Sequence, residues 1–167
     1  MYTAERNNLN HVETIVDILL EQYTKYISTD SPVEPFIIGL TGSVAAGKTT
    51  FAKTLKDRLE DKAELECVEV LGTDNFLLSN SELEALGLMR RKGFPESYNN
   101  NKIANTLEKL KFSKESVEIE RYDHAKYDIV ENVKDLLKRT RIVIVEGLNI
   151  LHPEFNRSVK HIFNLTI

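Results

Sequence analysis

The sequence has few of the residues that mark secreted, zinc-binding or membrane-spanning proteins. Cys67 is the single cysteine among 167 residues, which excludes an internal disulfide and a zinc site built from several thiolates. It lies in an apolar run, where a small core residue is the expected role. The N-terminus lacks the apolar stretch of a signal peptide, and the apolar run from Ile15 to Leu20 is too short to cross a bilayer. We therefore expect a cytoplasmic protein without membrane attachment.

The chain also lacks an excess of positive charge. It has 22 lysines and arginines against 26 aspartates and glutamates, a net charge of -4 and a sequence pI of about 5.6. A mildly acidic surface argues against a function that depends on neutralising nucleic-acid phosphates. Since 41% of the residues are hydrophobic, the chain has enough apolar surface for one globular core. We expect one domain over residues 1–167 and no nucleic-acid partner.

Short apolar runs alternate with amphipathic segments along the chain. Apolar residues at three- and four-residue steps predict a helix over 9–28, which leads into a core from about residue 35. Ser81 and Glu84 have the spacing of a capping box for a brief helix that Gly87 would close. Further helices are predicted over 48–61, 101–111 and 131–139, and strands over 36–41, 67–71, 117–122, 141–145 and 161–167.

This alternation predicts an α/β fold with a mostly parallel sheet. In such sheets, ligands bind at the carboxyl ends of the strands. The residues that follow the predicted strands are therefore the first candidates for a functional site.

The clearest functional motif is the segment GSVAAGKT at residues 42–49, which matches the phosphate-loop pattern G-x-x-x-x-G-K-[ST]. Gly42 and Gly47 let the backbone approach a phosphate without a Cβ in the way, and the amides of the loop then converge at the start of a helix. Lys48 can reach the β- and γ-phosphates of ATP, and the Thr49 hydroxyl can ligate Mg²⁺. The residues expected to bind the nucleotide are Gly42, Ser43, Val44, Ala45, Ala46, Gly47, Lys48, Thr49 and Thr50.

Two acidic residues follow predicted strands. Asp74 comes after the second strand, and Glu146 comes after the most apolar one. Phosphoryl transfer needs one carboxylate near Mg²⁺ and another that orients or deprotonates the attacking hydroxyl. We assign Asp74 as the base and Glu146 to the metal; the reverse assignment also fits the sequence. Without the phosphate loop, an acid in this position would be read as a turn or cap residue.

Two further segments each allow two interpretations. Three cations at residues 90–92 precede a Gly-Phe-Pro turn and either line an anion site or form a solvated loop. Charge alone favours the solvated loop. Tyr122, His124 and Tyr127 either form an aromatic pocket for a polar organic substrate or lie on the surface as hydrogen-bonding side chains.

Five segments together resemble the bacterial type I pantothenate kinases, which are P-loop kinases. They are PFIIGLTGSVAAGKTT at 35–50, TDNFL at 73–77, LMRRKGFPESYN at 88–99, YDHAKYDIV at 122–130 and IVIVEGLNIL at 142–151. GFPESY and Y-x-H-x-x-YDIV are more specific than the phosphate loop. Uridine kinases and phosphoribulokinases share the loop and the acid after the second strand, but not these segments. The resemblance implies a three-layer P-loop kinase fold.

The resemblance also implies ATP-dependent phosphorylation of pantothenate, the first step of coenzyme A synthesis. Lys48 would steady the transferred phosphoryl group, and Asp74 would act on the pantothenate hydroxyl. Tyr122 and His124 match positions at the pantothenate and coenzyme A pocket, to which we also assign Tyr127. Lys53 matches a basic residue involved in feedback inhibition by coenzyme A. The family forms homodimers, so the resemblance implies a homodimer.

The chain departs from the family in two ways. The family member used for comparison has arginine at the position of Lys53, and lysine lacks the planar fork of that side chain, so we expect weaker inhibition by coenzyme A. The family's chains are longer, and this one stops at Ile167 within an apolar strand pattern. We expect a truncated product that lacks the C-terminal part of the family fold. Three interpretations stand: a pantothenate kinase, an inactive nucleotide- or coenzyme A-binding fragment, and a uridine-kinase-like enzyme.

Overall fold

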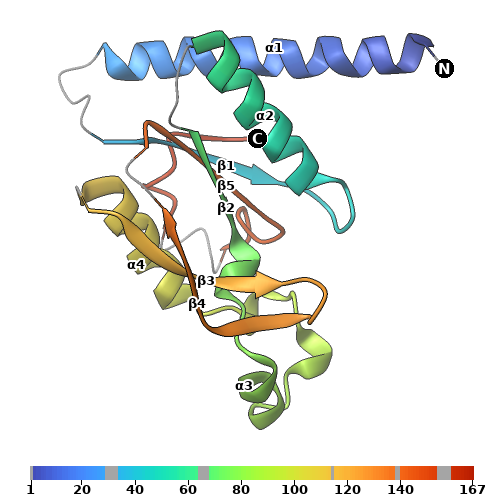
Figure 1. Ribbon diagram of the computed structural model, residues 1–167, viewed down its shortest axis with the longest axis vertical. Helices are drawn as coiled ribbons and strands as arrows, with labels where there is room; N and C mark the ends of the chain where they lie inside the picture. The colour runs from blue at the N-terminus through green and yellow to red at the C-terminus, as the bar shows by residue number, and fades with distance from the viewer. Residues whose placement is uncertain (1, 29–33, 64–67, 114, 138–139, 154–158) are drawn as a thin grey trace.

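The chain is built around a four-stranded parallel sheet (Figure 1). The computed structural model describes residues 2–28, 34–63, 68–113, 115–137, 140–153 and 159–167. The strands of the sheet are β1 (Phe36–Thr41), β2 (Val68–Gly72), β5 (Ile142–Gly147) and β6 (Leu165–Thr166). Their order is β2-β5-β1-β6, and each neighbouring pair is parallel. This sheet confirms the predicted α/β fold.

Helices cover both faces of the sheet and give a three-layer arrangement (Figure 1). Helices α1 (Tyr2–Ile27) and α2 (Lys48–Ala63) pack on one face, and α4 (Asn100–Phe112) packs on the other. Successive strand side chains point to opposite faces, so Phe36 and Ile38 pack toward α1 and α2 while Ile37 packs toward α4. Burial on both faces explains why β1 and β5 read as continuous apolar runs.

An antiparallel hairpin lies beside this sheet and contradicts one prediction. Its strands are β3 (Val117–Asp123) and β4 (Asp128–Leu137), so the predicted helix over 131–139 is wrong. Residues 138 and 139 of that prediction lie outside the described residues. The spacing of Val133, Leu136 and Leu137 suggested a helix, but Leu136 is exposed and Leu137 is buried, as neighbours in a strand are. Pairing with β3 therefore decided the conformation.

Other boundaries differ in smaller ways. Helix α1 begins seven residues before the predicted start, and β6 covers only two residues of the strand predicted over 161–167. Helix α3 (Asn80–Ala85) has its capping box at Ser79 and Glu82, so the prediction of Ser81 and Glu84 is wrong. The Ser79 side chain accepts from Glu82 N, and the Glu82 carboxylate accepts from Ser79 N at 2.8 Å. Both serine–glutamate pairs have the same spacing, so only the backbone geometry separates them.

Short 3-10 helices occur in the segment between β2 and α4, one directly after β2 and two between α3 and α4. They are η1 (Thr73–Phe76), η2 (Met89–Arg91) and η3 (Pro95–Ser97). Cys67, at the start of the predicted second strand, lies outside the described residues. Within the described part of the chain, none of the helices combines the length and the apolar character that a membrane span requires.

Candidate active site at the phosphate loop

The segment between β1 and α2 has the backbone of a phosphate-binding loop. Ala45 and Gly47 have φ values of 58° and 78°, in the left-handed region, and Ala46 N donates to Ser43 O at 3.3 Å to close a turn. Alternation into the left-handed region turns successive amides toward one side, where the N-terminus of α2 adds positive potential. The ammonium group of Lys48 folds over the loop and donates to Ser43 O at 2.8 Å. This geometry is suited to a phosphate group.

A cavity of about 470 Å³ opens at this loop and joins it to the carboxyl ends of β2 and β5. Its lining residues are Val44, Ala45, Gly47, Lys48, Thr49, Thr50, Asp74, His124, Glu146, Gly147 and Leu148. The structure thus brings Asp74, Glu146 and His124 to the phosphate loop. Gly42, Ser43 and Ala46 shape the loop but do not line the cavity. Parallel pairing of the strands explains the convergence, because their carboxyl ends share one edge.

The Thr49 hydroxyl and the Glu146 carboxylate are in direct contact. Thr49 Oγ1, in the first turn of α2, donates to Glu146 Oε1, near the end of β5, at 2.9 Å. Both oxygens are hard donors of the kind that Mg²⁺ prefers. Among the described residues there is no group of three or more His, Cys, Asp and Glu side chains that could hold a metal. Two oxygen ligands beside a phosphate loop still fit Mg²⁺, which kinases hold with few side chains and with the phosphates of the substrate.

Asp74 reaches the cavity because η1 packs closely on β5. A Cβ added to Gly147 would lie 2.0 Å from Thr73 Oγ1, so only glycine at this position of β5 allows the approach. Asp74 lines the cavity, and its Oδ1 accepts from the hydroxyl of Tyr98 at 3.3 Å. Asp74 is therefore hydrogen-bonded to Tyr98 and at the same time lines the cavity at the phosphate loop.

Tyr122, His124 and Tyr127 pack together as an aromatic cluster, but its members face different surroundings. His124 lines the cavity and packs edge-on against Tyr122, with ring centroids 5.1 Å apart. Tyr122 is 8% exposed, and burial raises the pKa of its hydroxyl to about 12. Tyr127, in the turn between β3 and β4, packs edge-on against Tyr122 but is 54% exposed. Neither tyrosine lines the cavity at the phosphate loop.

Lys92 holds this cluster in place. Its ammonium group donates to Asn80 Oδ1 and to Tyr127 O, each at 2.6 Å, and lies over the rings of Tyr122 and Tyr127. Burial lowers the pKa of Lys92, against the attraction of Asp128 and Asp74. One of the three cations at 90–92 thus serves the aromatic cluster, which neither interpretation of the basic turn anticipated.

The other cations lie away from the cavity. Arg91 donates to Glu96 at 2.6 Å and stacks over the Phe94 ring, while Arg90 is exposed. Lys53 is exposed on α2, one helical turn beyond Thr49, and does not line the cavity. For Arg90 and Arg91 the geometry is that of a charged surface loop.

Sequence reasoning missed Tyr98, Asn75 and Lys92. Tyr98 bonds to Asp74, and Asn75 Oδ1 accepts from Tyr122 N at 2.9 Å, which joins η1 to the hairpin. Both tyrosine and asparagine belong to segments that carried the family resemblance, GFPESY and TDNFL. The resemblance of these segments to the family was the one signal available, because nothing in composition or spacing assigned these residues a role.

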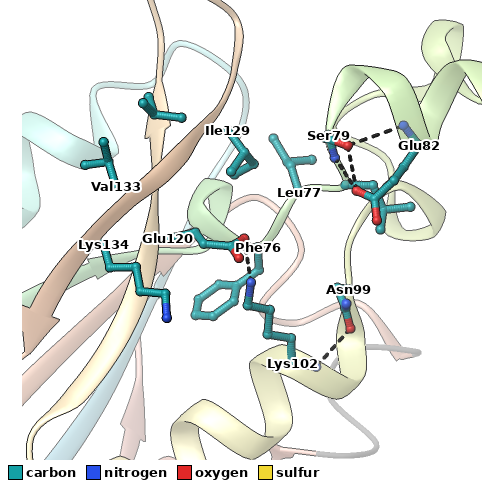
Figure 2. Close-up of a pocket in the computed structure, with 12 residues that line it drawn as sticks. Phe76, Leu77, Ser79, Glu82, Asn99, Lys102, Glu120, Ile129, Val133 and Lys134 are labelled. Carbon is teal, nitrogen blue, oxygen red and sulfur yellow. Dashed lines mark hydrogen bonds and ion pairs between the residues drawn. The ribbon is translucent and has the colours of Figure 1, made fainter.

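A second cavity, of about 460 Å³, lies between η1, α3, α4 and the β3–β4 hairpin (Figure 2). Phe76, Leu77 and Ile129 contribute its apolar wall. Lys102 pairs with Glu120 at 2.5 Å on its rim, and Glu82 is engaged by the Ser79 cap. Lys134, which also lines the cavity, donates to Glu118 at 2.8 Å. The charged side chains of this cavity therefore already have partners, in contrast to the converging groups at the phosphate loop.

The model of the phosphoribulokinase/uridine kinase family matches residues 37–167. A pantothenate kinase from Coxiella burnetii is 41% identical over 144 residues, which is 86% of this chain and 45% of that protein. A pantothenate kinase from Streptomyces avermitilis is 48% identical over 119 residues, 71% of this chain and 36% of that protein. The chain thus spans less than half the length of these curated relatives.

Two solved structures have similar folds. A proposed fructose transport system kinase from Silicibacter sp. TM1040 superposes with a TM-score of 0.80 at 25% identity, covering 93% of this chain and 72% of that one. A proposed uridine kinase from Bacillus stearothermophilus gives a TM-score of 0.63 at 16% identity, covering 93% and 79% of the two chains. At that identity the second likeness concerns the fold alone.

Proposed function

The chain belongs to the phosphoribulokinase/uridine kinase family, and on this basis we propose that it carries the catalytic site of an ATP-dependent pantothenate kinase. The observation that carries the proposal is the cavity in which the phosphate loop, Asp74, His124 and Glu146 meet. The choice of pantothenate is supported by relatives of 41–48% identity that bear this name. We likewise propose that residues 1–167 act as one domain and that the protein works in the cytoplasm.

In the proposed reaction, the amides of the loop and Lys48 bind the β- and γ-phosphates of ATP. Mg²⁺ would be held by the Thr49 hydroxyl and the Glu146 carboxylate, and it supplies charge neutralisation on the phosphates. The contact between these two side chains supports giving Glu146 to the metal. Lys48 stays with the γ-phosphoryl group as negative charge develops on its oxygens.

Asp74 would orient the hydroxyl of the acceptor and take its proton. The acceptor oxygen then bonds to the γ-phosphorus as the bond to the β–γ bridging oxygen breaks, and ADP leaves. His124 lines the same cavity, so it can contact the acceptor, and Tyr122 supports His124 from behind. Tyr127, which is exposed at the hairpin turn, would contact the acceptor farther from the reacting hydroxyl.

Regulation and assembly are further parts of the proposal. Lys53 would contact coenzyme A as a feedback inhibitor, and its exposure on α2 leaves it accessible to such a ligand. We expect Lys53→Arg to lower the inhibition constant of coenzyme A, because arginine adds a bidentate fork for phosphate. Equal inhibition constants for the two proteins would contradict this role. A homodimer is proposed from the resemblance alone.

A second candidate function is nucleotide binding without turnover. It is supported by the phosphate loop and Lys48, whose geometry suits a phosphate group whether or not an acceptor is bound. A uridine-kinase-like activity is the third alternative, since the family model includes uridine kinases.

One assay separates these functions. ADP release is measured with pantothenate, with uridine and without an acceptor, for the wild type and for Asp74→Ala. A pantothenate kinase releases ADP only with pantothenate, and Asp74→Ala lowers the rate by at least about a hundredfold. Release with uridine alone would assign the uridine-kinase-like activity. A thermal shift with Mg·ATP in the absence of any release would assign nucleotide binding only.

A further inference from the structure

We infer that Tyr98 is a positioning residue that holds the Asp74 carboxylate in its reactive orientation, and this inference rests on the proposed function of Asp74 as the base. Tyr98 is 6% exposed and does not line the cavity, whereas Asp74 does. The tyrosine hydroxyl therefore reaches Asp74 from the protein interior, with 3.3 Å between Tyr98 Oη and Asp74 Oδ1. Asp74 Oδ1 thus accepts a hydrogen bond from a buried side chain, while Asp74 lines the cavity at the phosphate loop.

The direction of this hydrogen bond follows from the chemistry of the two groups. Burial, followed by the negative charge of Asp74, raises the pKa of Tyr98 well above its ordinary value. The phenol therefore keeps its proton and donates it to the carboxylate. The hydrogen bond therefore fixes the orientation of the carboxylate through its Oδ1 atom.

The backbone fixes the distance between the two residues. Leu77 and Tyr98 form an antiparallel bridge, in which Leu78 N donates to Ser97 O and Asn99 N donates to Phe76 O, each at 2.9 Å. Asp74 and Tyr98 thus lie on two segments that are joined by a pair of main-chain hydrogen bonds. The main chain at Tyr98 cannot move away from the Asp74 segment without breaking this pair.

The turn before Tyr98 is itself rigid, which gives the GFPESY segment a physical role. Gly93 has a φ of 89°, and its amide donates to Ser97 Oγ at 2.9 Å. Ser97 Oγ donates in turn to Phe94 O at 2.7 Å, and the Ser97 side chain is fully buried. Pro95 starts η3 with a preset φ. The hydrogen bonds within this segment therefore position Tyr98 next to Asp74.

Other titratable groups also surround Asp74. Lys92 attracts it from the basic turn, and Tyr122 from β3 and Tyr98 both lie within its electrostatic reach. His124 and Glu146 share its cavity. Of these, Tyr98 is the side chain for which a direct hydrogen bond to Asp74 is observed, which makes it separable by mutation.

The first test compares Tyr98→Phe with Tyr23→Phe, a matched loss of a hydroxyl from a buried tyrosine on α1. With pantothenate as acceptor, we expect Tyr98→Phe to lower kcat about tenfold, because a misplaced base loses its alignment. The KM for ATP stays within about twofold. Tyr23→Phe changes neither value. An unchanged kcat in folded Tyr98→Phe would overturn the inference.

The second test needs no turnover, so it separates this inference from the proposed function. The midpoint of urea unfolding is measured for wild type, Tyr98→Phe, Asp74→Ala and the double variant. We expect Tyr98→Phe to lower the midpoint in the wild-type background. In the Asp74→Ala background the effect should vanish or reverse, because the hydroxyl then has no carboxylate partner. Additive effects would overturn the inference even if the kinase is active. Coupled effects without ADP release would leave the contact standing while the proposed function fails.

Discussion

Thr49 Oγ1 and Glu146 Oε1, which are 97 positions apart in the chain, lie 2.9 Å apart at the phosphate loop. The hydroxyl belongs to the first turn of α2, and the carboxylate belongs to the end of β5. Parallel pairing of β1 with β5 sets Leu40 beside Glu146 and so brings the carboxylate next to the loop that follows β1. Mutation of this pair therefore tests whether the loop and the end of β5 bind Mg·ATP together.

Glu146→Gln is predicted to weaken binding of Mg·ATP about tenfold, since the amide keeps the size of the side chain but loses the charge that Mg²⁺ prefers. The measurement is a thermal-shift titration with ATP, run with Mg²⁺ and with EDTA. The loss should be confined to the Mg²⁺ series. Glu84→Gln, an exposed change on α3, is the control and should bind as wild type. An equal loss in both series would remove Glu146 from the metal site.

Lys92→Met should loosen the aromatic cluster, because it removes the two 2.6 Å hydrogen bonds from Nζ to Asn80 Oδ1 and Tyr127 O. We expect a loss of about 1–2 kcal/mol in the free energy of unfolding. Trypsin should also cleave faster after Lys126, in the exposed hairpin turn, as followed by mass spectrometry. Arg90→Met removes an exposed cation from the same basic segment and serves as the control. Equal cleavage rates for the two variants would contradict the role of Lys92.

Lys111 is predicted to stabilise the junction of α4 with the start of β1. Its buried ammonium group donates to Pro35 O at 3.1 Å and to Asn164 Oδ1 at 2.8 Å, and burial lowers its pKa. Lys111→Met would remove the Lys111 donor from Pro35 O and one of two donors from Asn164 Oδ1, which also accepts from Ile37 N at 2.8 Å. We expect a cost of about 2 kcal/mol in the free energy of unfolding. Lys109→Met, on the exposed side of the same helix, should change it by less than about 0.5 kcal/mol. Urea unfolding measures both, and similar costs would refute the proposed contribution.

Stability should fall between pH 10 and about pH 12 in part through Tyr122. Burial raises the pKa of Tyr122 from 10 to about 12, so the folded protein keeps this proton more tightly than the unfolded chain does. Its contribution is complete below pH 10 and is lost as the pH rises toward 12. Tyr122→Phe should flatten the decline by up to about 1.4 kcal/mol per pH unit in this window. Guanidinium unfolding at pH 9, 10, 11 and 12 checks this, and identical slopes would contradict it.

The hairpin shows where prediction from the sequence failed. Val133, Leu136 and Leu137 have spacing that fits a helix, yet the segment pairs as β4 along β3. Nothing local distinguished the two conformations, because short apolar groups fit both periods. The partner strand supplied the backbone hydrogen bonds that decided the outcome. By contrast, β1, β5 and α2 had strong patterns of their own, and their predicted bounds agree with the structure within two residues.

By itself, the sequence determined the phosphate loop, the parallel layers and the two acids at strand ends, because glycine positions and apolar periodicity act over a few neighbouring residues. Only the tertiary structure decided that Glu146 contacts Thr49, that Tyr98 supports Asp74 and that Lys92 serves the tyrosines. The Tyr98–Asp74 hydrogen bond joins residues 24 positions apart, and the Thr49–Glu146 hydrogen bond joins residues 97 positions apart. Their geometry depends on strand order and on the close approach of η1 to Gly147, which no local pattern encodes.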